Sequence, residues 1–171
     1  MRRLRRGSAV PSDVVDRAGL RRGERVLASA ATEDGTWLLA TRDALVVVGP
    51  GTSRVPWEGV ETADWDRDAG RLRVSEVGEF GRPRPVHEFV PVEPALLLAT
   101  VRERVTASVV LQRRAVVSGR RGVTVVARRP PGGGEPAWAV EYDVGIDPDD
   151  PAVRLVADET LAAARSEIGS A

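Results

Sequence analysis

Short apolar runs separated by turn residues fill the stretch from 36 to 77, and this pattern limits the possible fold most strongly. In TWLLAT (36–41), Trp37 and Leu39 alternate with Leu38 and Ala40, and all four are apolar. Apolar residues on both faces are typical of a central strand that is covered on both sides. In RLRVSEV (71–77), Leu72 and Val74 alternate with polar residues, so this strand is expected to bury one face only. The stretch therefore predicts antiparallel β-structure.

The pattern continues on both sides of this stretch and then changes its period. Residues PSDVVDRAGL, near the N-terminus, predict a short helix after a basic tail. In the segment that follows Pro94, apolar and small residues recur every three or four positions, which predicts one helix over 94–111. Further strands are expected over residues 24–31, 44–49, 53–60, 61–66 and 87–92.

After residue 112 the pattern becomes β-like again. Two β-branched runs flank the loop SGRRG, which predicts a hairpin, and AWAVEYDV (137–144) alternates as a third strand. Asp150 and Pro151 suit the N-cap and first position of a final helix. We expect residues 112–171 to form a ββ-β-α extension, either packed on the preceding sheet or forming a small second unit. The expected buried stripe of the helix is Val153, Val156, Thr160, Leu161, Ala164 and Ile168.

The order of GERVLA, TWLLATRDALVVV, RVPWEGVETADWD, GRLRVSEV and HEFVPVEPALLLATVRERV resembles the bacterial pleckstrin-homology-like domains and their GRAM-like relatives. The resemblance covers residues 23–111, with 1–22 as a preceding basic tail and short helix. It implies an α+β fold, in which a strongly bent antiparallel β-sheet or partly open barrel is capped by the helix at 94–111. It also implies a non-catalytic scaffold or protein-interaction domain, acting on a protein partner or by self-association.

Some members of that family bind phosphoinositides through basic residues in the first inter-strand loop. The corresponding loop here, Ala31 to Gly35, contains Glu33 and Asp34 and no cation. Its charge would repel a phosphate, which argues against phosphoinositide binding at this loop.

Composition excludes several kinds of chemistry. All 25 basic residues are arginine, there is no cysteine, and His87 is the single histidine. These absences exclude lysine Schiff bases, thiol nucleophiles, disulfides and thiolate metal sites. No motif surrounds His87, and no catalytic motif joins the other polar residues, so we expect a non-enzymatic protein without a cofactor. The N-terminal arginines do not lead into a signal-peptide apolar region, and no apolar run spans a bilayer, which predicts a cytoplasmic protein without a transmembrane segment.

Two carboxylate clusters have simpler interpretations than metal binding. Counted from Asp64, Gly70 and Glu76 fall at positions seven and thirteen, whereas an EF-hand loop needs glycine at about position six and glutamate at about twelve. A hairpin turn fits this segment better. The aspartates at 147, 149 and 150 precede a helix, where capping and favourable interaction with the helix dipole explain them.

Two groups of residues remain as candidate contacts. Trp57 and Trp65 lie among polar residues, so we expect them to be partly exposed and available to a partner. A hairpin could bring three arginine pairs near one end, although adjacent strand residues point to opposite faces. A solvated surface explains these pairs; the alternative is a patch that binds nucleic acid or another anionic ligand. The pairs are Arg113 and Arg114, Arg120 and Arg121, and Arg128 and Arg129.

Overall fold

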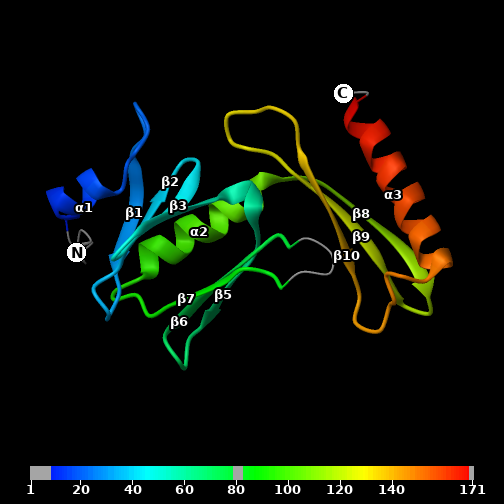
Figure 1. Cartoon of the computed structure of the whole chain (residues 1–171), viewed down its shortest axis with the longest axis horizontal. Helices are drawn as coiled ribbons and strands as arrows, with labels where there is room; N and C mark the ends of the chain where they lie inside the picture. The colour runs from blue at the N-terminus through cyan, green and yellow to red at the C-terminus, as the bar shows by residue number, and fades with distance from the viewer. Residues whose placement is uncertain (1–8, 79–82, 170–171) are drawn as a thin grey trace, which may run out of the picture. The chain divides into compact units, whose positions relative to one another are not determined.

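The computed structural model describes residues 9–78 and 83–169 of the chain. The basic tail expected over residues 1–9 therefore lies outside the described residues except for its last position. Over these residues the fold is α+β, with three antiparallel sheets and three α-helices (Figure 1). Contacts divide it into two compact units. The N-terminal unit holds the chain through Ala107 together with Pro130–Gly132, and the C-terminal unit holds Ser108–Arg129 and the chain from Gly133 on.

Two antiparallel meanders build the N-terminal unit. The first has the strand order β1-β2-β3-β4 and the second β5-β6-β7. A 3-10 turn, η1 (Trp57–Gly59), connects them; it splits the strand expected over 53–60, because Pro56 has no N–H for a ladder. The strands are β1 (Val26–Ala31), β2 (Trp37–Thr41), β3 (Ala44–Val48), β4 (Thr52–Pro56), β5 (Val60–Asp66), β6 (Arg71–Glu76) and β7 (Val86–Phe89).

The helix α2 (Ala95–Ser108) closes the core of this unit, as Figure 1 shows. Leu97 and Val101 of α2 are buried in one cluster with residues from both meanders. A shorter helix, α1 (Ser12–Arg17), packs on the other face of the first sheet, where Val14 meets Leu39 and Val46. The prediction that β2 is covered on both faces is therefore confirmed.

The two meanders meet at one corner. Thr32, after β1, forms an isolated bridge with Pro91, after β7, and the N–H of Val92 donates to the carbonyl of Ala31 over 2.7 Å. The described strands remain in separate sheets and close no barrel. The α+β class is thus observed.

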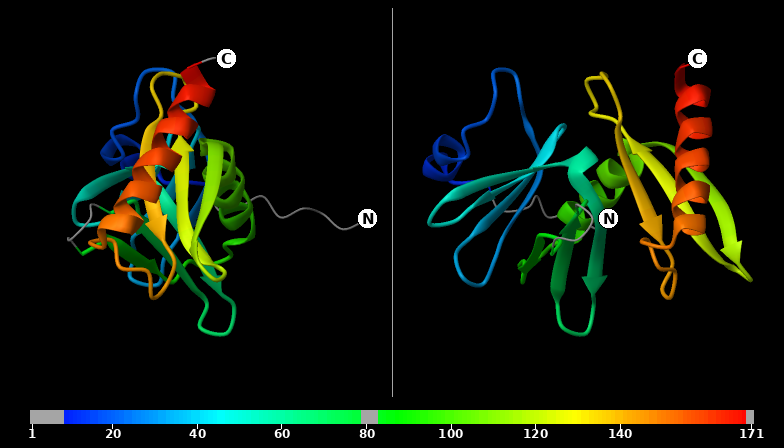
Figure 2. Two further views of the ribbon diagram at one scale, coloured as in Figure 1. Left: turned by 90° about the vertical axis from the view of Figure 1, so that its right-hand side faces the viewer. Right: turned by 45° about the vertical axis from the view of Figure 1, so that its right-hand side comes forward.

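The C-terminal unit contains the expected hairpin, strand and helix. Its sheet has the order β10-β9-β8, and the helix α3 (Pro151–Gly169) lies along one face of it (Figure 2). Val153 and Ala157 of α3 pack against Val123 of the sheet. Asp150 caps α3 as predicted, because its Oδ1 accepts the N–H of Ala152 over 2.8 Å. The strands are β8 (Val109–Ser118), β9 (Arg121–Arg128) and β10 (Ala137–Tyr142).

The prediction of a helix over 94–111 is wrong for its last three residues. α2 ends at Ser108, and Val109 begins β8. In the strand, Val109 pairs with Arg128, and Leu111 pairs with Ala127. Helical and strand patterns are hard to distinguish in a short apolar run such as Val-Val-Leu. Pairing with β9 places these three residues in a strand.

Candidate functional site

Trp57 is completely buried, so the expectation that its side chain is partly exposed is wrong. Its indole Nε1 donates to the carbonyl of Thr41 over 3.1 Å, and its backbone N–H donates to the carbonyl of Asp43 over 3.2 Å. The bend at Pro56 and the η1 turn point the ring into the core. Trp57 therefore joins β4 to the turn between β2 and β3 and has no surface to offer a partner.

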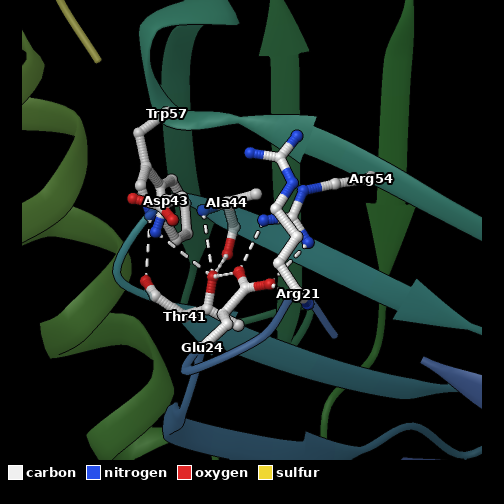
Figure 3. Close-up of polar contacts among 7 residues, drawn as sticks. All are labelled: Arg21, Glu24, Thr41, Asp43, Ala44, Arg54 and Trp57. Atoms are coloured by element: carbon white, nitrogen blue, oxygen red, sulfur yellow. Dashed lines mark hydrogen bonds and ion pairs between the residues drawn. The ribbon is translucent and has the colours of Figure 1, made fainter. Parts of the chain in front are cut away.

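A buried ion pair lies next to Trp57 (Figure 3). The side chain of Glu24, from the loop between α1 and β1, is 1% exposed, and that of Arg54 on β4 is 23% exposed. Arg54 donates to both oxygens of Glu24, over 2.5 and 3.1 Å. The hydroxyl of Thr41 and the backbone N–H of Arg21 donate to the same carboxylate over 2.6 and 2.9 Å. Every oxygen of this carboxylate is thus engaged within the protein.

Thr41 links the ion pair to the β2–β3 turn. Its hydroxyl accepts the N–H groups of Asp43 and Ala44, over 3.2 and 3.1 Å, while it donates to Glu24. Thr41 is 0% exposed. One polar network therefore joins four segments of the N-terminal unit: the loop before β1, the end of β2, the β2–β3 turn and β4.

The network holds Glu24 ionised. Burial by itself raises the pKa of Glu24, but the hydrogen bonds from Arg54, Thr41 and the Arg21 backbone outweigh it and lower the pKa to about 2. A carboxylate whose pKa is lower in the folded than in the unfolded state stabilises the fold above its unfolded pKa.

The lowered pKa of Glu24 makes the stability of the fold depend on pH. The stabilisation by Glu24 is expected to be complete above its ordinary pKa of 4.5 and to disappear as the pH falls toward about 2. Urea denaturation of the wild type and of Glu24→Gln at several pH values measures it. The difference between their unfolding free energies should shrink in this window; a difference that stays constant from neutral pH to about pH 2 would contradict the prediction.

Trp65 lies in a different environment. It is partly exposed, as expected, and it lines a groove of about 440 Å³ between β5, β6 and α2. The groove is lined by Ala63, Asp64, Trp65, Leu72, Leu98, Ala99, Val101 and Arg102. Most of these side chains are apolar, so the groove is suited to an apolar group that leaves water.

The three arginine pairs do not meet at one end of the hairpin. Arg114 pairs with Thr124 in mid-strand, whereas Arg128 pairs with Val109 at the end away from the turn. Arg113 contacts Glu167 over 3.1 Å. The hairpin therefore does not gather all six arginines at one end, because the pairs are spread along its length.

Carboxylates also reduce the positive charge of these pairs. Asp143 forms an ion pair with Arg114 and accepts the N–H of Gly122 over 2.9 Å. The Arg114 hydrogen bond lowers the pKa of Asp143, and the same contact raises the pKa of Arg114. Nη1 of the buried Arg128 lies 3.8 Å from Glu141. Arg120 and Arg121 are exposed near the turn, and Arg129 is half-buried.

The other candidate residues have structural partners. Asp66 Oδ1 accepts the N–H groups of Asp68 and Ala69, over 3.0 and 2.9 Å, as a hairpin turn requires. His87 Nε2 lies 2.6 Å from Glu76, and its ring stacks on Phe89. Within residues 9–78 and 83–169, no group of three or more potential ligands is arranged to hold a metal ion.

The arginines of the segment RRGER (21–25) are not among the candidate residues predicted from the sequence. Arg21, Arg22 and Arg25 line a hollow together with Arg42 of the β2–β3 turn. The run itself was visible in the sequence, but its proximity to Arg42 depends on the fold.

No family model, curated protein or solved structure matches the chain. None of the helices described here is both long and apolar enough to traverse a lipid bilayer.

Proposed function

We propose that the N-terminal unit is a non-enzymatic protein-interaction domain that binds an extended segment of a partner protein in the groove between β5 and α2. The observation that carries this proposal is the groove between β5 and α2, which is lined by the partly exposed Trp65 of β5. Aromatic side chains at such positions contribute large contact area for little loss of conformational entropy.

The position of β5 explains why an extended segment fits. β5 is an outer strand of its sheet and, within the described chain, pairs only with β6. Three consecutive residues of β5, Ala63, Asp64 and Trp65, line the groove. An extended peptide can add to the edge of such an outer strand through backbone hydrogen bonds while alternate side chains enter a pocket.

The lining indicates the chemistry of the partner segment. Leu72, Leu98 and Trp65 provide apolar surface for apolar side chains. Arg102 is exposed at the groove, and no carboxylate among the described residues pairs with it. An acidic residue in the partner would therefore complement the helix side of the groove.

The alternative, binding of nucleic acid or another anion by the arginine hairpin, has less support. The pairing of β8 with β9 places the three arginine pairs at different positions along the hairpin. In addition, Arg113, Arg114 and Arg128 each lie within 4 Å of a carboxylate. A heparin or DNA binding assay at low salt tests this alternative, which requires an affinity that weakens as salt increases.

Ala99→Arg tests the groove. Ala99 is exposed on α2 and lines the groove, so an arginine there fills the groove without disturbing the core. Extended peptides selected from a displayed random library against the wild-type chain are expected to bind Ala99→Arg at least about tenfold more weakly, because the variant blocks apolar contacts worth about 1–3 kcal/mol. Fluorescence polarisation of the labelled peptides measures the affinities.

Ala107→Arg is the matched control, since Ala107 is exposed on the same helix and does not line the groove. It should bind the selected peptides like the wild type. The proposal fails if the selection gives no binder, or if the two variants weaken binding equally.

A further inference from the structure

A second hollow, remote in sequence from the β5–α2 groove, is rich in unpaired positive charge. It measures about 420 Å³ and is formed by the loop before β1 and the β2–β3 turn. Arg21, Arg22 and Arg25 have no hydrogen-bonded or ion-paired partner for their side chains within the described residues. The hollow is lined by Arg21, Arg22, Gly23, Glu24, Arg25, Leu27, Arg42 and Asp43.

The buried network explains why these arginines remain unpaired. Glu24 is the carboxylate nearest to them in sequence, but its oxygens are occupied by Arg54, Thr41 and the Arg21 backbone. The pKa of Glu24, about 2, keeps it ionised and committed to Arg54. It therefore contributes little to neutralising the loop.

An adjoining hollow of about 210 Å³ adds one arginine and one glutamate to the first hollow, so the excess of positive charge stays unchanged. It shares Arg21 and Asp43 with the first and adds Arg54 and Glu58. Figure 3 shows the Arg21 side chain extending beside that of Arg54. Together the two hollows contain five arginines and three carboxylates, an excess of two positive charges that matches one dianion.

Backbone donors add to this arrangement. Gly23 has a φ of 81°, a conformation that glycine adopts without strain, and nothing lies within 4 Å of the position of a Cβ there. The N–H groups of Arg22 and Gly23 have no acceptor within the part of the chain that the structure describes. Successive N–H groups in such a turn form a concave site for an anion.

The guanidinium groups that line the hollow and the volume of the hollow together indicate its ligand. Arginine pairs with phosphate oxygens through two parallel hydrogen bonds. A hollow of about 420 Å³ exceeds the needs of a lone phosphate, and Leu27, 44% exposed, offers it an apolar wall. We propose that this arginine hollow binds the dianionic phosphate group of a phosphate monoester, with the organic part of the ester against Leu27.

Phenyl phosphate, titrated into the full chain at low salt, is the probe, and amide chemical shifts are the readout. The amides of Arg22 and Gly23 are expected to shift and saturate, with an affinity about tenfold or more above that for benzoate, since only the phosphate is a dianion that takes several charge-assisted bonds. Increasing salt should weaken binding. Arg21→Gln/Arg25→Gln should lower the affinity about tenfold or more.

Arg67→Gln/Arg120→Gln is the matched control, because it also removes two exposed arginines, from turns outside the hollow. It should bind phenyl phosphate like the wild type. Absence of saturation, or equal weakening by the two double variants, would overturn the proposal. A thermal unfolding curve of each variant verifies that the fold is retained.

Vesicles distinguish the two sources of a phosphate monoester. Sedimentation with vesicles of phosphatidylcholine plus phosphatidic acid, compared with phosphatidylcholine alone, tests a lipid headgroup. Sedimentation that phenyl phosphate reverses assigns the site to a headgroup, and saturable phenyl phosphate binding without sedimentation assigns it to a soluble ester. Both outcomes support the hollow as a phosphate site, and neither depends on the β5–α2 groove.

Discussion

Glu24→Gln is expected to lower the unfolding free energy of the N-terminal unit by about 2–3 kcal/mol at neutral pH. The carboxylate is 1% exposed and receives four hydrogen bonds, two of them from Arg54. A glutamine fills the same space but has no charge, and its NH₂ group would face donors. The partly buried guanidinium of Arg54 then lacks its counter-charge, and this loss dominates the cost.

Urea denaturation followed by circular dichroism measures this effect, and Glu88→Gln is the control. Glu88 pairs with Arg71 at the surface, where both side chains are about half exposed. Removing a pair of that kind typically costs less than about 1 kcal/mol. Equal destabilisation by the two variants would show that the Glu24 network contributes no more than a surface ion pair.

Local patterns were sufficient to predict several elements. β2 has apolar residues at successive positions, and α1 and α2 cover its two faces. Leu72 and Val74 on β6 are buried while their neighbours Arg71 and Arg73 are exposed. Asp150 and Pro151 mark the start of α3. In each case the pattern of apolar, polar or capping residues within a few positions was enough to predict the element.

The candidate sites depend on contacts between distant residues, which a single sequence does not reveal. Glu24 looks like one charge among the arginines of an exposed loop, but its partner Arg54 is 30 residues away. Arg114 likewise meets Asp143, 29 residues further along the chain. The prediction of solvated arginines holds for Arg113, Arg114, Arg120 and Arg121, which are exposed, and is wrong for the buried Arg128. Charge patterns along the sequence could not show which of these arginines lie near a carboxylate.

Trp57 shows the same difficulty for an aromatic residue. Its neighbours Pro56 and Glu58 are polar or turn-forming, and this local company suggested exposure. The direction of the ring depends on the backbone path through η1, which brings Nε1 to the carbonyl of Thr41, 16 residues earlier. Trp57 is therefore buried because residues of both meanders pack around it, and most of these residues are distant from it in the sequence.

Trp57→Ala is expected to destabilise the N-terminal unit by about 3–5 kcal/mol, the largest effect of any single substitution considered. The ring is 0% exposed and lies in the cluster that joins both meanders to α2. Its removal leaves a cavity, and the carbonyl of Thr41 loses the indole donor. A buried acceptor without a donor costs about 1–3 kcal/mol by itself.

Trp57→Phe separates these two contributions. Phenylalanine retains most of the apolar volume but no N–H donor, so we expect a loss of about 1–3 kcal/mol, clearly smaller than that of Trp57→Ala. Trp37→Phe is the matched control, because Trp37 is only partly buried and its indole has no hydrogen-bond partner within the described residues. Circular dichroism during urea denaturation compares the three variants. If Trp57→Phe costs no more than Trp37→Phe, the hydrogen bond to Thr41 contributes little, and packing alone accounts for the position of Trp57 between the meanders.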